Sequence, residues 1–466
     1  MFGTTKASIT NLKLTNLDVE LTEAKGEYGV IAGSINNAAA YVANCSASGK
    51  MKINLDMTEA ITGNDGDIVI GGLVGVTSSN EEFYDLVNEM NIEISGTYKN
   101  SIVAAGLIGA GESCSLSSST NLGSITYNGT SANHVFIGGL VVQCKEVTDC
   151  VNGSAKDASH AKGSLTVDGK TKNAYAAGFA PTVRSSISLV RCHNYGAITY
   201  TANAATGGTT ILAGAVGYCS PSTAQLSLDS CSNNAPILVD NSVVGGDLKV
   251  GGVVGHLGGS VPIIILNGYT NTGDFTINPA SVASSKGVQV GGMIGNYSST
   301  WTETSTGTLR NKGNITYAGA SSTGSTVRIA GMLAAMAKVP PTSLKMVNTG
   351  NLNVTGTGKY VYVGGIVGAG KVVENADCYC EIYAPDATGV GWIMAAARTS
   401  TLVAKNCRVG GRNITGWDDS DMDPVAKGIR IVESNFMNYI YSGGSQTDWT
   451  GTDNYDGCSF LSSKPQ

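Results

Sequence analysis

The cluster VGGVVG at residues 250–255 decides the fold, because variants of it recur along almost the whole chain. IGGLVG at 70–75 and VGGMIG at 290–295 are close copies, and VGWIMA at 390–395 is a degenerate one. Most copies lie 33 to 40 residues apart, and a fixed period in this range is typical of a solenoid, a propeller or an array. The eleven central glycines stand at 33, 72, 106, 139, 178, 214, 252, 292, 331, 365 and 391.

A second signature, Asn-x-Gly-x-aliphatic, lies between successive clusters. Examples are CHNYGAI at 192–198, NTGDF at 271–275 and NKGNI at 311–315. Each example runs into a short alternating segment such as ITY or FTI. Each repeat therefore contains two kinds of strand, one nearly continuous apolar run that starts with Gly-Gly and one run that alternates after an Asn-Gly turn.

Helices and propeller blades fit this pattern poorly. Glycine costs about 1 kcal/mol relative to alanine at a helical position, and the clusters contain several glycines each. EEFYDLVNEM at 81–90 comes nearest to a helix, and we expect one or two helical turns on a loop there. Propellers have four to eight four-stranded blades, whereas this chain has eleven shorter repeats and only 6% aromatic residues.

We therefore predict an all-β fold, a right-handed parallel β-helix (β-solenoid) of about eleven coils with almost no α-helix. At a rise of about 4.8 Å per coil, the stack would be a rod roughly 50 Å long. We expect an N-terminal strand or cap region at 1–27, the solenoid at 28–415 and a non-repetitive C-terminal cap at 416–466. An internal ladder of stacked amide side chains is expected from Asn88, Asn121, Asn152, Asn194, Asn233, Asn271, Asn311, Asn348 and Asn375.

We predict that most of the eleven cysteines act as small buried apolar residues. One position of the Asn-Gly signature is cysteine in some repeats and apolar in others, and we predict that Cys150, Cys192 and Cys231 at this position are buried free thiols. The odd total argues against a complete disulfide framework, although one or two bridges between neighbouring coils stay open. The residues that share this position are Cys45, Leu86, Cys150, Cys192, Cys231, Tyr269, Leu309 and Met346.

Composition argues against two classes of partner. The net charge is −6 and only 14% of residues are charged, whereas nucleic-acid binding needs a basic face and a polybasic membrane contact needs clustered lysine and arginine. The sequence has no run of 18 apolar residues, so we expect no transmembrane helix. The surface, rich in Gly, Ser, Thr and Asn, favours an extracellular or outer-surface protein in mature or trimmed form, with a lipid anchor upstream as one route to the surface.

The Gly-Gly cluster followed by Asn-x-Gly-x-aliphatic resembles the GLUG-type repeat over about residues 28–410. That repeat occurs in bacterial surface proteins, including adhesins and the non-catalytic regions of immunoglobulin A proteases. The chain is also similar in style to exported β-helix surface proteins of gut Bacteroidetes. The resemblance implies a surface location and a binding or display role, and it implies no catalytic residue. Together with the polar but uncharged surface, which suits hydroxyl-rich ligands, it leads us to expect a non-enzymatic adhesion or binding protein with a glycan or host glycoprotein as partner.

An enzyme is the alternative reading, because β-helices also carry polysaccharide lyases and glycoside hydrolases. Such enzymes need clustered acids, or acids with a lysine or arginine, in neighbouring coils. Loops of the middle coils, such as TANAATGGTT at 201–210, contain no charge. We therefore expect no enzymatic activity, and the feature that decides is whether three charged side chains converge in one cleft.

Two segments depart from the repeat. WDDSDMD at 417–423 brings four carboxylates together, and Asp418, Asp419, Asp421 and Asp423 are candidate calcium ligands, with a solvated acidic turn as the alternative. The sequence predicts no other cofactor.

The second departure is the aromatic C-terminal segment. Tyr439, Tyr441 and Trp449 are candidate platforms for sugar rings, since flat aromatic faces suit the apolar side of a pyranose. The alternative is a cap that covers the open end of the solenoid, where strand edges and an apolar interior would otherwise be exposed.

Overall fold

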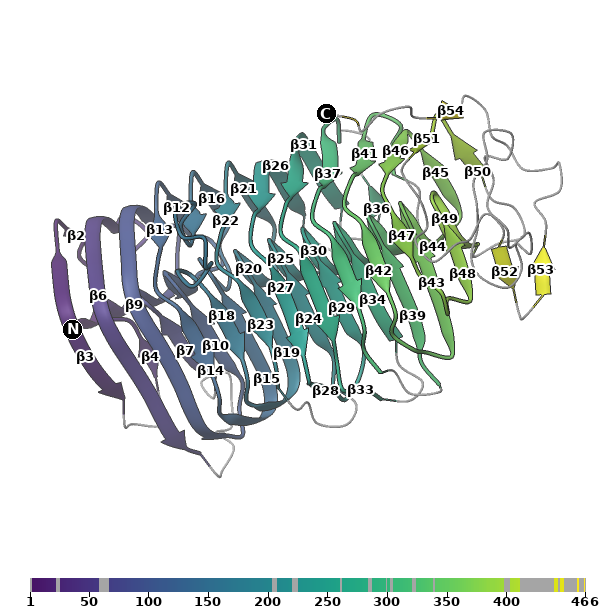
Figure 1. The fold of residues 1–466 in the computed structure, drawn as a ribbon. Coiled ribbons are helices and arrows are strands. Elements are labelled where there is room, and N and C mark those ends of the chain that lie inside the picture. Colours follow the sequence, from purple (N-terminus) through teal and green to yellow (C-terminus); the bar gives the residue numbers. More distant parts are fainter. Residues whose placement is uncertain are drawn as a thin grey trace.

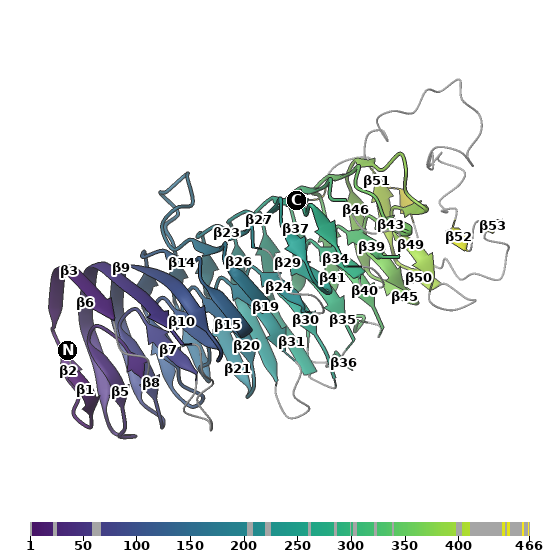
Figure 2. The same ribbon diagram turned by 90° about the horizontal axis from the view of Figure 1, so that it is seen from below.

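The protein is an elongated stack of parallel β-strands, as the computed structural model shows (Figures 1 and 2). Every described element is a strand, and every strand pair is parallel except β52–β53, so the predicted all-β solenoid is confirmed. The structure describes residues 2–21, 26–57, 67–202, 208–219, 225–259, 262–283, 287–298, 300–301, 305–320, 324–337, 340–397, 403–410, 440–442, 445–447, 459–460 and 465.

Each coil contains a sharp corner at its Gly-Gly cluster, with one strand leading in and another leading out. We call the two stacks of strands the entry column and the exit column. The entry column comprises β4 (Glu27–Tyr28), β7 (Ile68–Gly71), β10 (Ile102–Ala105), β15 (Thr130–Gly138), β19 (Lys170–Ala177), β24 (Thr210–Ala213), β29 (Leu248–Gly251), β34 (Gly287–Gly291), β39 (Thr326–Ala330), β43 (Tyr360–Gly364) and β48 (Gly389–Gly391). The exit column comprises β1 (Phe2–Thr5), β5 (Ala32–Ile35), β8 (Val74–Thr77), β11 (Ile108–Ala110), β20 (Ala180–Val183), β25 (Val216–Cys219), β30 (Val254–Leu257), β35 (Ile294–Tyr297), β40 (Leu333–Met336), β44 (Val367–Gly370) and β49 (Met394–Ala397).

The corner requires glycine because the next coil lies directly against it. A Cβ atom placed on Gly252 would collide with the carbonyl oxygen of Gly292 in the next coil and would lie 2.7 Å from Cγ of Asn271. The predicted central glycines from Gly72 to Gly365 all face the following coil in this way. The first copy is shifted, because Ala32 pairs with Val74 and so places Val30, not Gly33, opposite Gly72.

The rest of each coil forms the other walls of the solenoid. In the first coils these walls are single long strands, β3 (Lys13–Leu21), β6 (Tyr41–Asp56) and β9 (Glu82–Tyr98). The later walls comprise β12 (Ser115–Ser117), β13 (Thr120–Asn121), β14 (Ile125–Tyr127), β16 (Glu146–Thr148), β17 (Val151–Asn152), β18 (Leu165–Val167), β21 (Ile187–Val190), β22 (His193–Asn194), β23 (Ile198–Tyr200), β26 (Leu226–Asn233), β27 (Ile237–Asp240), β31 (Pro262–Asn271), β32 (Phe275–Asn278), β37 (Thr308–Asn311), β38 (Ile315–Tyr317), β41 (Lys345–Asn348), β42 (Leu352–Val354), β46 (Ala376–Tyr379), β47 (Ile382–Tyr383) and β51 (Arg408–Gly410). Short additional strands are β2 (Ile9–Thr10), β28 (Val243–Val244), β33 (Ser281–Val282), β36 (Thr300–Trp301), β45 (Val372–Glu374), β50 (Val403–Lys405), β52 (Ile440–Ser442), β53 (Ser445–Thr447) and β54 (Ser459–Phe460).

The segment 81–90, expected to form helical turns, is instead the first half of strand β9. Buried and exposed residues alternate along β9 except at two irregularities, one at Gly96, with a φ of 105°, and one inside the segment at Asp85, whose φ is 54°. That left-handed residue breaks the alternation, which made a strand look like a short amphipathic helix in the sequence.

Eight asparagines form the predicted internal ladder. Each Nδ2 donates a hydrogen bond to Oδ1 of the asparagine in the next coil, over 2.7–2.9 Å. The members are Asn88, Asn121, Asn152, Asn194, Asn233, Asn271, Asn311 and Asn348, all buried. The most regular part of the solenoid is thus eight coils long, somewhat fewer than the eleven predicted.

Asn375 does not belong to the ladder, which corrects the sequence prediction. Cys378 pairs with Asn348 and so occupies the ladder position in that coil. Asn375 lies at another corner, with a φ of 55°. Its carbonyl oxygen accepts a hydrogen bond from the N–H of Met346 in the preceding coil, and its own N–H donates to the carbonyl oxygen of Lys405 in the following coil. Asparagine is favoured there because its side chain tolerates the left-handed conformation.

The cysteine prediction is confirmed for Cys150, Cys192 and Cys231, which are free and at most 3% exposed. They stack in register from coil to coil, and Cys231 pairs with Tyr269, an apolar residue at the same position. Each thiol lies 3.2–3.4 Å from the carbonyl oxygen two residues earlier, so the sulfur fills space without losing its weak hydrogen bond.

At the C-terminal end, β54 pairs with β51, and β52 and β53 form an antiparallel hairpin. The domain limits at 27 and 415, and the cap at 416–466, stay predictions. Among the described residues, no helix is long and apolar enough to cross a membrane.

Candidate ligand-binding groove

Most of the predicted site residues lie outside the described residues. This holds for Asp418, Asp419, Asp421 and Asp423, and also for Tyr439 and Trp449. Tyr441 lies in strand β52, but its side chain is not among the described ones. In the described part of the chain, no group of three or more His, Cys, Asp or Glu residues is arranged to hold a metal ion.

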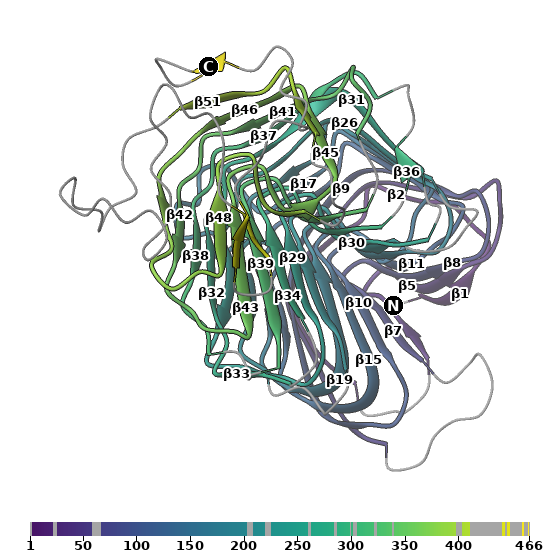
Figure 3. The same cartoon turned by 90° about the vertical axis from the view of Figure 1, so that its right-hand side faces the viewer.

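The structure presents a different candidate, a concave groove between the entry and exit columns. The two columns diverge from the Gly-Gly corner, as the view along the solenoid axis shows (Figure 3). Outward side chains of both columns meet across this angle. Nδ2 of Asn296, on exit strand β35, donates to Oε1 of Gln289 on entry strand β34, 2.5 Å away.

Two in-register rows of side chains line the groove, one from each column. The entry row is Glu27, Val69, Val103, Phe136, Tyr175, Ile211, Lys249, Gln289, Arg328 and Tyr362. The exit row includes Thr4, Ser34, Val76, Ala110, Thr182, Tyr218, His256, Asn296, Ala335 and Ala369. In-register stacking places members of a row about 4.8 Å apart in successive coils, except that the exit row has no strand in the coil of Phe136.

An aromatic run occupies the middle of the groove. The rings of Phe136 and Tyr175 stack with centroids 4.8 Å apart, and those of Tyr218 and His256 stack at 5.3 Å. Tyr175 and Tyr218 link the two rows across the groove at 5.9 Å. Val103, Ala105, Phe136 and Val142 form a small apolar cluster here, separate from the solenoid core. The groove therefore has an apolar, aromatic floor on the outer surface of the molecule.

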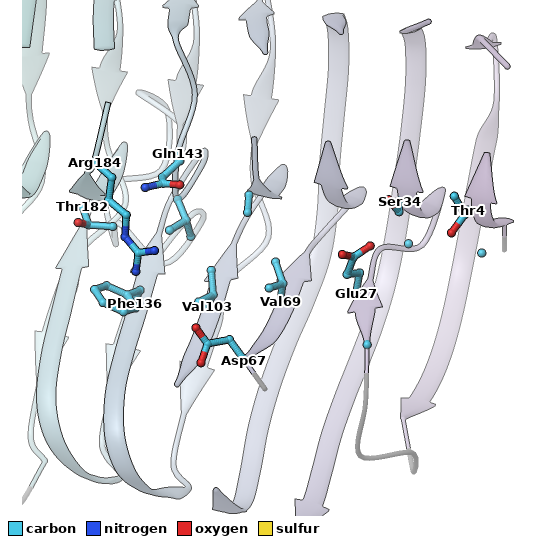
Figure 4. A pocket seen from close by; sticks show the side chains of 15 residues that line it. Thr4, Glu27, Ser34, Asp67, Val69, Val103, Phe136, Gln143, Thr182 and Arg184 are labelled. Atoms are coloured by element: carbon cyan, nitrogen blue, oxygen red, sulfur yellow. The ribbon is translucent and has the colours of Figure 1, made fainter. Parts of the chain in front are cut away.

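The N-terminal half of the groove opens into a pocket of about 510 Å³ (Figure 4). Glu27, Asp67 and Arg184 are its charged lining residues, and they come from different coils. The guanidinium of Arg184 lies 5.9 Å from the ring centroid of Phe136, a cation–π contact. Oδ1 of Asp67 accepts a hydrogen bond from the backbone N–H of Ser101 over 3.1 Å, which holds that carboxylate in place.

Gln143 lines the same pocket with an unused hydrogen-bond donor. Its side chain is 8% exposed, and its Nε2 atom is buried without a hydrogen-bond partner. Gln143 lies in the coil where the exit column is interrupted between β11 and β20 and one isolated bridge, Ile108 to Val141, replaces a strand. A buried amide without a partner costs about 1–3 kcal/mol, which a ligand oxygen would offset.

Two histidines of the groove are kept neutral by their surroundings. Burial lowers the pKa of His134, and the positive charge of Lys172 adds to the effect. Burial also lowers the pKa of His256 to about 4, with Lys249 as the next contribution. The His256 ring stacks on Tyr218, and the His134 ring is tilted against Tyr175. Nδ1 of both histidines is buried without a hydrogen-bond partner.

These residues could not be predicted from the repeat pattern, because the residue type at their positions varies from coil to coil. The entry row lies at the residue before the aliphatic position that precedes Gly-Gly, as in LKVGG at 248–252 and VQVGG at 288–292. The sequence signal that could have identified them is a position with a variable residue type on each side of the constant Gly-Gly cluster. The bend at the glycines determines which outward side chains of the entry and exit columns face each other, and the sequence pattern does not specify this bend.

No family model, no curated protein and no solved structure matches this chain.

Proposed function

We propose that the protein is a non-enzymatic cell-surface adhesion or glycan-binding protein that holds a glycan, free or on a glycoprotein, in the concave groove. The observation that carries this proposal is the aromatic run of Phe136, Tyr175, Tyr218 and His256 along the groove, in which Phe136 is buried and the other three rings are partly exposed. Aromatic faces suit the apolar faces of sugar rings, and Tyr and His also supply polar atoms for hydroxyl groups.

Groove length and polarity also support an extended sugar chain. The coil rise of about 4.8 Å is close to the length of one sugar unit in an extended glycan, so successive coils would meet successive units. The lining offers uncharged hydrogen-bonding groups, namely Thr4, Ser34, Gln143 and Thr182, between its few charges. The location outside the cell rests on the composition and on the resemblance to GLUG-type repeats.

A pair of matched tyrosine variants tests the proposal. The purified protein is screened on a glycan and glycoprotein array, and the best ligand is then titrated by calorimetry. We expect Tyr175→Ala to weaken binding about tenfold, the equivalent of roughly 1.4 kcal/mol. Tyr84→Ala is the control, since Tyr84 stacks on Tyr41 at 6.1 Å on a different wall of the solenoid. Equal affinities of the two variants would contradict the groove as the binding site.

The aromatic C-terminal segment stays a competing site in the same experiment. Trp449→Ala tests it directly, and the β-type circular dichroism spectrum shows whether the solenoid survives the change. Loss of binding in Trp449→Ala with an intact spectrum, and full binding in Tyr175→Ala, would move the site to that segment.

A second candidate function, a polysaccharide lyase or glycoside hydrolase, is favoured by one observation. Glu27, Asp67 and Arg184 line a single pocket, although they come from different coils and share the cleft without converging on one point. Two carboxylates, or a base with a cation, are the groups that such chemistry needs. Release of oligosaccharides from polysaccharides, lost in both Glu27→Gln and Asp67→Asn, would establish the enzyme and overturn the non-enzymatic proposal.

A further inference from the structure

Two cysteines outside the stacked column lie unusually close together. Cys114 is in the connection between β11 and β12, and Cys144 is in the segment that follows the interruption of the exit column. Their Sγ atoms are 3.0 Å apart, about 1 Å more than a covalent S–S bond. Both side chains are buried, at 0% and 2% exposure.

The backbone around this pair already has the spacing that a disulfide needs. Ser115 pairs with Glu146, and the N–H of Lys145 donates to the carbonyl oxygen of Cys114 over 3.0 Å. The two cysteines therefore lie on adjacent coils, offset by one residue. An offset of one residue, about 3.3 Å, combined with the strand spacing of about 4.8 Å puts the Cα atoms about 6 Å apart, within the 4.4–6.8 Å that is usual for a disulfide.

The cysteines of the stacked column differ in this respect. Cys150, Cys192 and Cys231 face one another in direct register. Direct register holds Cβ atoms about 4.8 Å apart, beyond the roughly 3.5–4.5 Å that a disulfide takes. Sγ of Cys231 instead accepts the backbone N–H of Cys192 over 3.4 Å.

We propose that Cys114 and Cys144 form a disulfide that joins two consecutive coils beneath the groove. The oxidant is a small or protein disulfide, such as oxidised glutathione. The thiolate of one cysteine attacks the oxidant and releases one thiol, and the thiolate of the other then displaces the second. Two cysteine thiols and one oxidant disulfide thus become one protein disulfide and two reduced thiols, with no change in total protons.

The bond forms before the coils close. Burial raises the pKa of the Cys144 thiol well above its usual value, and a buried thiol is a poor nucleophile. Folding in an oxidising compartment would therefore set the bond. Since Cys144 directly follows Gln143, the crosslink would also fix the pocket wall where the exit column is interrupted.

Peptide mapping tests the bond directly. The full chain is refolded with reduced and oxidised glutathione, denatured without reductant, alkylated and digested with trypsin. Both cysteines lie in one tryptic peptide, residues 100–145, which chymotrypsin then cleaves after Tyr127 or Phe136. We expect the two halves to stay joined until reductant is added, with nine of the eleven thiols alkylated. Alkylation of all eleven thiols, or a bond between another pair, would overturn the proposal.

A double variant provides an independent measurement. The melting temperature of the wild-type protein and of Cys192→Ala should drop on reduction, whereas that of the double variant Cys114→Ala, Cys144→Ala should not. A double variant that still responds to reductant would contradict the assignment. If the double variant does not fold, the mapping of the wild-type protein decides alone.

Discussion

Replacing one asparagine in the middle of the ladder should destabilise the surrounding coils strongly. Asn233 accepts a hydrogen bond from Nδ2 of Asn194 over 2.7 Å and donates to Oδ1 of Asn271 over 2.8 Å. It also donates to the carbonyl oxygen of Ala235 over 3.0 Å. Asn233→Ala removes all three bonds inside a buried column, without access for water to replace them.

The expected loss follows from these three contacts. Each net hydrogen bond contributes about 1 kcal/mol, and each orphaned buried group costs about 1–3 kcal/mol. Asn194 and Asn271 are each left with one unsatisfied group, so we expect a loss of about 3–6 kcal/mol. Asn353→Ala is the control, because Asn353 is exposed on β42, and we expect a change within about 0.5 kcal/mol.

Hydrogen exchange followed by mass spectrometry is the appropriate assay, since coils of a repeat protein contribute to stability locally. A loss of about 3 kcal/mol corresponds to amide exchange accelerated about 100-fold in the coils next to Asn233. Asn88→Ala should have a smaller effect, because Asn88, at the ladder's end, bonds only one ladder neighbour, Asn121. Unchanged exchange around residue 233 would refute the view that the ladder stabilises the solenoid.

Three further predictions concern a thiol, a histidine and the acidic loop. Cys192→Ser should destabilise by roughly 1–3 kcal/mol, because a hydroxyl replaces a buried sulfur, and denaturation midpoints check this; detection of Cys192 in a disulfide would contradict its free state. Because burial holds the pKa of His256 near 4, the unfolded chain takes up a proton first as pH falls below about 6.5, so the melting temperature should drop between pH 6.5 and 4. His256→Asn, the residue of the next coil, should flatten that drop, and parallel curves would count against the assignment. Millimolar calcium should raise the melting temperature if the 418–423 loop binds it, and an unchanged value would leave only an acidic turn.

The sequence by itself determined the repeating environments of the solenoid. In a parallel stack, equivalent residues of successive coils have the same surroundings. A residue type that the fold requires at one position therefore appears again in each repeat of the sequence. This is why the corner glycines, the asparagine ladder up to Asn348 and the cysteines at 150, 192 and 231 were predictable.

Local exceptions were beyond the sequence pattern. Asn375 comes 27 residues after Asn348, closer than any two ladder members, and takes a left-handed corner, while Cys378 fills the ladder position. The segment 81–90 looked helical because left-handed Asp85 shifts its alternation. In each case one backbone conformation changes which way the following side chains point, and residue identity alone does not specify it.

Only the tertiary structure decided where a ligand site lies. Tyr175 and Tyr218 are 43 residues apart, yet the bend at the glycine corner brings their rings within 5.9 Å. Gln143, whose Nε2 has no hydrogen-bond partner, lies in the coil where the exit column is interrupted. Because the core residues repeat, they can be predicted from the sequence. The groove consists of outward-facing residues that do not repeat. The angle between the entry and exit columns determines which of them are neighbours.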